Sequence, residues 1–172
     1  MNQTLLKLAT CAACAAVGLA NAPAHAQGEP APEFIDGTAQ DLGWHSAQQN
    51  YLLELRPADG WHFMERGLRW RWLEYTGSQE RPSVADIVTV HYEGKLIDGT
   101  VFDSSYASGR PATFPLGRLV RGWQLAIPNM GVGDTIEIAI PADLAYGPRG
   151  RDPIPGGATL VFKVELINIG AE

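Results

Sequence analysis

Apolar and polar side chains alternate along most of the chain after residue 61. A side-chain period of two is typical of a β-strand with one buried and one solvated face. A further segment follows Asp98-Gly99, a dipeptide typical of a hairpin turn. Because one face stays polar, the pattern favours antiparallel pairing and predicts about five antiparallel strands. The four clearest alternating runs are residues 68–72, 88–93, 136–140 and 160–166.

A short helix is predicted within residues 119–130. In this segment Val120, Trp123 and Ile127 fall on one side of a helix. Pro128 removes a backbone donor and discourages helix at the residue before it, so we expect the helix to end there. The apolar face of a sheet needs a cover, and this helix can supply it.

A second short helix is expected nearer the N-terminus. Ser46 and Gln49 have the spacing of a capping box, in which two side chains satisfy the free N–H groups of a first turn. Apolar residues follow, and Pro57 would stop the helix. Too little sequence precedes it for a long coiled-coil arm, so we expect a monomer.

Two long connections, residues 102–116 and 141–157, interrupt the strand pattern. The second contains four prolines and four glycines. Connections of this length are uncommon in a compact domain and are usually functional or disordered. Large apolar side chains in a rigid proline-rich frame argue against disorder. We therefore expect the two loops to form a functional site. They carry Phe102, Asp103, Phe114, Tyr146 and Ile154.

The first 26 residues have the form of a secretory signal peptide. Lys7 precedes an apolar run from 8 to 20, and Ala24-His25-Ala26 matches a signal-peptidase site. The run is too short to be a membrane span. Cleavage after Ala26 would remove both cysteines and place a protein with no membrane segment in the periplasm or outside the cell. The chain is thus expected to comprise a signal peptide (1–26), a flexible leader with a short helix (27–60) and a folded domain (61–172).

Composition and motifs argue against several classes of function. The chain has 13 basic and 19 acidic residues, a net charge of −6 and no basic stripe, so nucleic-acid binding is not indicated. His45, His62 and His91 lack the spacing of metal ligands. Ser104 and Ser105 have no neighbouring base to activate them. We expect neither a metal nor another cofactor.

Four segments, taken in order, resemble the FKBP-type peptidyl-prolyl cis-trans isomerases. The segments read VTVHYEGKLIDGTVFDSS, FPLGRLVRGW, IPADLAYGPRG and PIPGGATLVFKVELINI. A fifth segment, WHFMERGLRWRWLEYTG (61–77), resembles the lead-in strands of secreted bacterial members, including those of the macrophage-infectivity-potentiator kind. The resemblance implies an α+β fold, with a curved antiparallel sheet wrapped around one short helix and the active site between them.

The resemblance also implies which residues form the site. Trp123 would be its floor, Tyr146 would donate a hydrogen bond to a bound carbonyl, and Asp103 would lie beside the twisted amide. Asp103 could instead accept a hydrogen bond from Tyr92 and only shape the pocket, since a buried charge must be paired or hydrogen-bonded. Catalytic roles are expected for Asp103 and Tyr146, and substrate contacts for Tyr92, Phe102, Phe114, Leu119, Val120, Trp123, Ile154 and Phe162.

The function implied by this resemblance is isomerisation of X-Pro bonds in exported polypeptides, with macrolides such as tacrolimus and rapamycin as inhibitors. A non-catalytic chaperone or a module that binds proline motifs is the alternative. Ala112 keeps it open because family members often have an aromatic ring there. Ser108 does so because a basic residue is common at its position.

Overall fold

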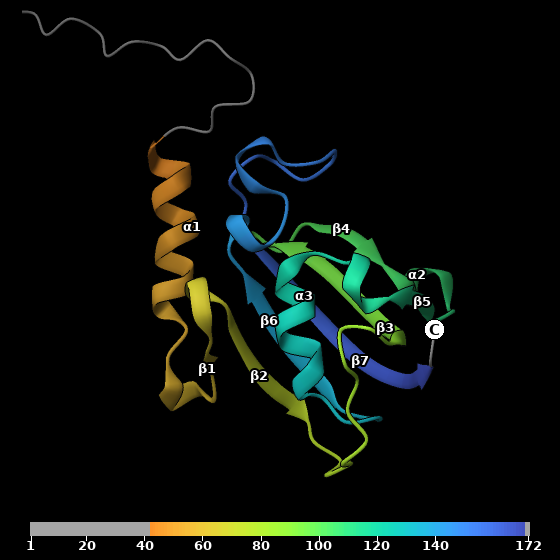
Figure 1. Ribbon diagram of the computed structural model, residues 1–172. Coiled ribbons are helices and arrows are strands. Elements are labelled where there is room, and N and C mark those ends of the chain that lie inside the picture. The colour runs from red at the N-terminus through yellow and green to blue at the C-terminus, as the bar shows by residue number, and fades with distance from the viewer. Residues whose placement is uncertain (1–41, 171–172) are drawn as a thin grey trace, which may run out of the picture. The chain divides into compact units, whose positions relative to one another are not determined.

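The computed structural model describes residues 42–170 (Figure 1). The predicted signal peptide and the first part of the predicted leader lie outside the described residues. None of the helices in the described range is long and apolar enough to cross a membrane.

One antiparallel sheet organises the described part of the chain. It has seven strands, with the order β1-β2-β6-β7-β3-β4 and with β5 paired to β3. The longest pairing joins β3 to β7, from Leu96 opposite Leu160 to Ile87 opposite Gly170. The strands are β1 (His62–Phe63), β2 (Arg69–Glu74), β3 (Ile87–Leu96), β4 (Val101–Ser104), β5 (Ala112–Pro115), β6 (Thr135–Ile140) and β7 (Leu160–Gly170).

The predicted number of strands, about five, was wrong. The five expected segments correspond to β2, β3, β4, β6 and β7, and the additional strands are β1 and β5. These two have two and four residues, which is too short for a period of two to stand out from a loop. The expected hairpin turn lies between β3 and β4, where the Asp98 carboxylate accepts a hydrogen bond from the Thr100 backbone N–H at 2.8 Å.

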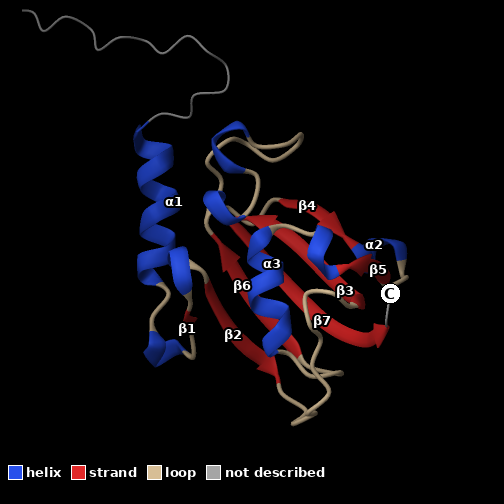
Figure 2. Ribbon diagram, in the orientation of Figure 1, coloured by secondary structure: helices blue, strands red, loops and turns tan. Residues whose placement is uncertain are grey.

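Within residues 42–170, three α-helices accompany the sheet: α1 (Leu42–Glu54), α2 (Ser105–Ser108) and α3 (Arg121–Ala126). Figure 2 shows α3 in front of the sheet. A 3₁₀ turn, Ile127–Asn129, continues α3 and contains Pro128, so the regular helix ends before the proline as expected. The capping-box prediction was wrong, because α1 begins before Ser46 and places that residue inside the helix.

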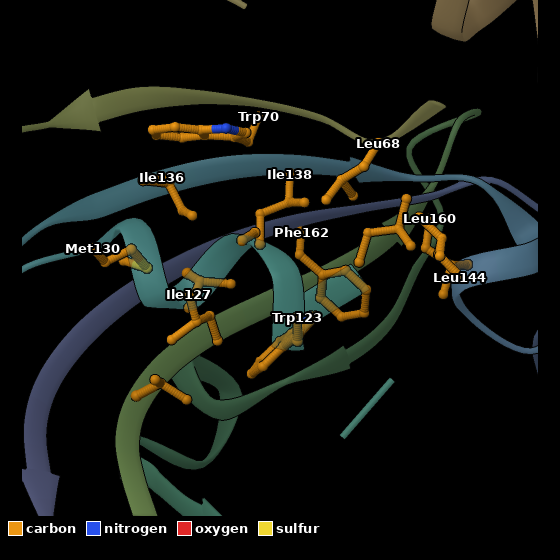
Figure 3. Close-up of a cluster of buried hydrophobic side chains, with 14 of the residues drawn as sticks. Leu68, Trp70, Trp123, Ile127, Met130, Ile136, Ile138, Leu144, Leu160 and Phe162 are labelled. Carbon is orange, nitrogen blue, oxygen red and sulfur yellow. The ribbon is translucent and has the colours of Figure 1, made fainter. Parts of the chain in front are cut away.

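The core lies between α3 and the sheet, and its residues come from both (Figure 3). Trp123 and Ile127 on the helix side pack in one cluster with Ile138, Leu160 and Phe162 on the strands. Each fully buried aliphatic side chain contributes roughly 1.5–3 kcal/mol to the free energy of unfolding. Gly122 permits this packing, because a Cβ atom there would lie 2.5 Å from the Ile140 side chain. Core packing therefore fixes where Trp123 stands.

Candidate active site

An aromatic cavity of about 280 Å³ opens between α3, the sheet and the two long loops. Its lining includes nine of the ten residues that the sequence predicted for the site, together with Arg151. The lining residues are Tyr92, Phe102, Asp103, Phe114, Leu119, Val120, Trp123, Tyr146, Arg151 and Phe162. Ile154, the tenth predicted residue, is 7% exposed and belongs to the core cluster, outside this lining.

The walls of the aromatic cavity are rings that meet edge to face. The Trp123 ring centroid lies 5.3 Å from that of Phe162 and 5.5 Å from that of Tyr92, with interplanar angles of 87° and 81°. Phe102 meets Phe162 at 5.5 Å and 85°. This is a favoured geometry for aromatic pairs, because the positive edge of one ring faces the negative face of the other. Figure 3 shows Trp123 and Phe162 side by side at the helix–sheet boundary.

Gly94 in β3 makes room for two of these rings. A Cβ atom at this position would lie 2.6 Å from ring atoms of both Phe102 and Phe162. A side chain at residue 94 would therefore displace the two phenylalanines and reshape the cavity. The requirement concerns close approach, since Gly94 is not among the glycines with positive φ.

Asp103 and Tyr92 form the polar pair of the cavity. The Tyr92 hydroxyl donates a hydrogen bond to a carboxylate oxygen of Asp103 at 2.7 Å. Burial, and then the hydrogen bond and negative charge of Asp103, raise the pKa of Tyr92 well above its ordinary value. The phenol therefore stays protonated at neutral pH and remains a donor to the carboxylate.

The serine at the end of the Phe102–Ser105 stretch holds β3 in place. Ser105 is buried, and its hydroxyl oxygen accepts a hydrogen bond from the Tyr92 backbone N–H at 2.7 Å. The same hydroxyl lies 3.2 Å from the Tyr92 carbonyl oxygen and 2.9 Å from His91 Nδ1. The expectation that no base lies beside Ser105 was wrong, because His91 is within hydrogen-bond distance. The hydroxyl is nevertheless buried and bonded to the Tyr92 backbone, which indicates that it fixes the strand and does not act as a nucleophile.

Helix α1 holds the 141–157 loop and the residues just after it, a contact that sequence reasoning missed. Gln48 is 4% exposed, and its side-chain oxygen accepts a hydrogen bond from the Thr159 backbone N–H at 2.8 Å. The Trp44 indole N–H donates to the Gly156 carbonyl at 3.3 Å. Gly157 has φ +75°, and a Cβ atom there would lie 3.2 Å from the His45 ring. Nothing in the local sequence of α1 signals these contacts, because their partners are more than 100 residues away.

A second cavity, of about 340 Å³, lies between α1 and the same loop. It is larger than the aromatic cavity, but no Phe, Tyr or Trp side chain lines it. Ring chemistry, not volume, distinguishes the candidate active site. Within residues 42–170, no group of three or more His, Cys, Asp or Glu side chains is arranged to hold a metal ion.

The chain is similar to proteins of one family. The profile described as FKBP-type peptidyl-prolyl cis-trans isomerase matches residues 78–167, just over half of the chain. A curated relative, the FKBP-type 22 kDa peptidyl-prolyl cis-trans isomerase of Escherichia coli, is 48% identical over 120 residues, which are 69% of this chain and 58% of that protein. The peptidyl-prolyl cis-trans isomerase Mip of Coxiella burnetii is 47% identical over 107 residues, covering 62% and 46%.

The crystal structure of FkpA from Escherichia coli superimposes with a TM-score of 0.70 at 36% sequence identity. The alignment covers 73% of this chain and 59% of that one. The chain spans about half the length of the curated relatives described above. The matched residues include the strands and the helix α3 that enclose the aromatic cavity.

Proposed function

Because the chain belongs to the FKBP-type peptidyl-prolyl cis-trans isomerases, we propose that it accelerates rotation about X-Pro peptide bonds. The aromatic cavity carries the proposal. It lies within the segment that matches the family, and it combines a wall of rings with a hydroxyl from Tyr146 and a carboxylate from Asp103. Its volume of about 280 Å³ is ample for a prolyl ring and the amide that precedes it.

The cavity would act by treating the planar and twisted amides unequally. An X-Pro bond rotates unaided in tens to hundreds of seconds, because rotation breaks the resonance of the C–N bond. The twisted amide is less dipolar than the planar one, so water stabilises the planar form more. A site lined by rings removes that advantage, and only such differential stabilisation accelerates a reaction. A thousandfold acceleration requires about 4 kcal/mol and no covalent step.

Each predicted site residue has a proposed role in this scheme. Trp123 forms the floor under the prolyl ring, and Phe102 and Phe162 enclose it. The Tyr146 hydroxyl donates a hydrogen bond to the carbonyl oxygen of the residue before proline. Asp103 acts at the mouth of the cavity, either on the twisted amide or by holding Tyr92 in place. The remaining contacts are assigned to Tyr92, Phe114, Leu119 and Val120, and Ile154 supports the loop from below.

The wider biological setting is also a proposal. The isomerase domain spans residues 61–172, behind a signal peptide (1–26) and a leader (27–60). The exported protein acts in the periplasm or outside the cell on proline-containing clients. Tacrolimus and rapamycin would compete for the same cavity, and the protein would act as a monomer. Two hydrogen bonds join the end of the leader to the domain: the Trp44 indole N–H donates to the Gly156 carbonyl, and the Thr159 N–H donates to the Gln48 side chain.

A binding module without turnover remains the second candidate. Ala112 stands where family members often have an aromatic ring, and it is not among the residues that line the cavity. The Ser108 hydroxyl donates to the Ser105 carbonyl at 2.9 Å, so it supplies no charge partner for Asp103. A pure binder would retain the cavity and tacrolimus affinity but leave the rate of isomerisation unchanged.

A protease-coupled assay on a Leu-Pro tetrapeptide tests the proposal, with Tyr146→Phe as the diagnostic variant. We expect the wild type to shorten the slow phase. Loss of the hydroxyl should lower turnover by roughly one order of magnitude, about 1.4 kcal/mol in the barrier. The ring stays, so the variant should remain folded and bind tacrolimus with weaker affinity at most. An unchanged slow phase with the wild type would refute the isomerase function and favour the binding module.

A further inference from the structure

Two charged side chains, Asp103 and Arg151, line the aromatic cavity, and their surroundings differ. The Asp103 carboxylate accepts the hydrogen bond from Tyr92. The Arg151 guanidinium carbon lies 5.7 Å from the centroid of the Tyr146 ring. Within residues 42–170, every ion pair joins an arginine other than Arg151 to its carboxylate. Arg151 thus presents a positive charge beside the cavity, and no carboxylate of the described residues lies within ion-pair distance of it.

Backbone hydrogen bonds fix the place of Arg151 in the loop beside the cavity. The Arg151 N–H donates to the Ile154 carbonyl at 2.9 Å, and the two residues form an antiparallel bridge. Ile154 is 7% exposed and packs in the core cluster. The buried Ile154 therefore holds the backbone at Arg151, whose side chain is exposed.

We propose that Arg151 is a specificity-determining residue that favours substrates with an acidic residue directly before the proline. The inference rests on the proposed isomerase function. If the Tyr146 hydroxyl binds the carbonyl of the residue before proline, that residue lies next to the ring that Arg151 covers. A side chain on that residue that extends toward Arg151 would meet a guanidinium, which binds carboxylates in a bidentate manner.

Charge alone also constrains the design of the test. The chain has a net charge of −6, which repels an acidic peptide at long range whatever Arg151 does. The effect of Arg151 must therefore be measured as a ratio between two peptides and compared with a variant of equal net charge. Arg149→Gln provides this control. Arg149 lies in the same loop, is exposed and does not line the aromatic cavity.

The experiment uses acetyl-capped, amidated peptides Ala-Xaa-Pro-Phe with Glu, Gln or Lys as Xaa. Exchange NMR measures cis–trans rates without a protease, whose own specificity would interfere, and without a succinyl cap, which carries a carboxylate. The readout is the ratio of kcat/KM for the Glu peptide to that for the isosteric Gln peptide. Since exposed ion pairs are weak, we expect this ratio to fall by roughly two- to fivefold in Arg151→Gln. It should stay at the wild-type value in Arg149→Gln, and Arg151→Glu should shift the preference toward Lys.

The possible failures can be told apart. A wild type that isomerises the Gln peptide, but whose Glu/Gln ratio is unchanged in Arg151→Gln, overturns the specificity role and leaves the isomerase function intact. A wild type that accelerates the Leu-Pro tetrapeptide but none of these peptides also overturns the specificity role alone, whereas one that accelerates neither these peptides nor the Leu-Pro tetrapeptide overturns both. If Arg151→Gln does not fold, Arg151→Met, which has a long uncharged side chain, takes its place in the same comparison.

Discussion

The hydrogen bond between Tyr92 and Asp103 decides between the two roles left open for the carboxylate. A double-mutant cycle of Tyr92→Phe and Asp103→Ala isolates it, because each single variant removes the same contact. The distance of 2.7 Å and the ionised acceptor indicate a charge-assisted bond. Such bonds contribute roughly 1.5–3 kcal/mol to the free energy of unfolding. Because Asp103 is exposed, water can replace much of the interaction, so we expect a coupling energy of about 1 kcal/mol.

Urea unfolding of the four proteins gives the coupling in stability, and kcat/KM on a Leu-Pro peptide gives the coupling in activity. If Asp103 only shapes the cavity, both single variants should lose similar activity and the double variant should be no worse than either. If Asp103 acts on the twisted amide, Asp103→Ala should still lower activity when Tyr92 is already Phe. A coupling energy indistinguishable from zero in stability would refute the importance of the hydrogen bond itself.

Tyr106→Phe is the matched control for this cycle. The Tyr106 hydroxyl also donates to a carboxylate, that of Glu165, at 3.3 Å. Neither residue lines the aromatic cavity. Loss of a hydroxyl–carboxylate pair outside the cavity should therefore leave kcat/KM at the wild-type value, which shows whether losses in the cycle are specific to the site.

Three further perturbations test the framework around the site. Trp123→Ala should lower the free energy of unfolding by roughly 3–5 kcal/mol and abolish activity, because Trp123 belongs both to the core and to the cavity floor. A folded variant with full activity would contradict the site assignment. Gln48→Ala leaves the buried Thr159 N–H without its acceptor, so the free energy of unfolding should fall by roughly 1–3 kcal/mol. Hydrogen exchange of the backbone amides should also accelerate in residues 141–159. Unchanged exchange there would refute the role of α1 in holding the loop. Burial of the Asp134 carboxylate tends to raise its pKa. Hydrogen bonds from Thr76 and from the Gly131 N–H outweigh this effect, so the pKa of Asp134 is lowered. The ionised Asp134 therefore stabilises the fold above the ordinary Asp pKa of about 4, and this contribution is lost as the pH falls through the lower folded-state pKa. Urea unfolding between pH 6 and 2 should show a flatter pH dependence of stability for Asp134→Asn than for the wild type.

The long strands could be predicted from the sequence because they depend on local pattern, whereas Tyr92, Trp123 and Phe162 were predicted as site residues only through the resemblance to the family. A strand with one buried face must alternate, so the alternation alone was enough to predict β2, β3, β6 and β7. Pro128 cannot continue a regular helix, and its place after α3 followed from backbone chemistry alone.

Only the tertiary structure decided the features that depend on distant partners. β1 and β5 exist because longer neighbours pair with them, and their own two and four residues carry no period. α1 begins before Ser46, and its Trp44 and Gln48 contact residues 156 and 159. The capping box at Ser46 and Gln49 is a local pattern, and it could not reveal these distant contacts.

The same distinction separates Ile154 from Arg151. From the sequence, Ile154 was a candidate for the cavity, and no role was assigned to Arg151. The two residues form an antiparallel bridge, with the Ile154 side chain in the core and the Arg151 side chain beside Tyr146. In a loop rich in proline and glycine no periodicity relates one side chain to the next, so the direction of each depends on backbone hydrogen bonds that form only when the domain folds.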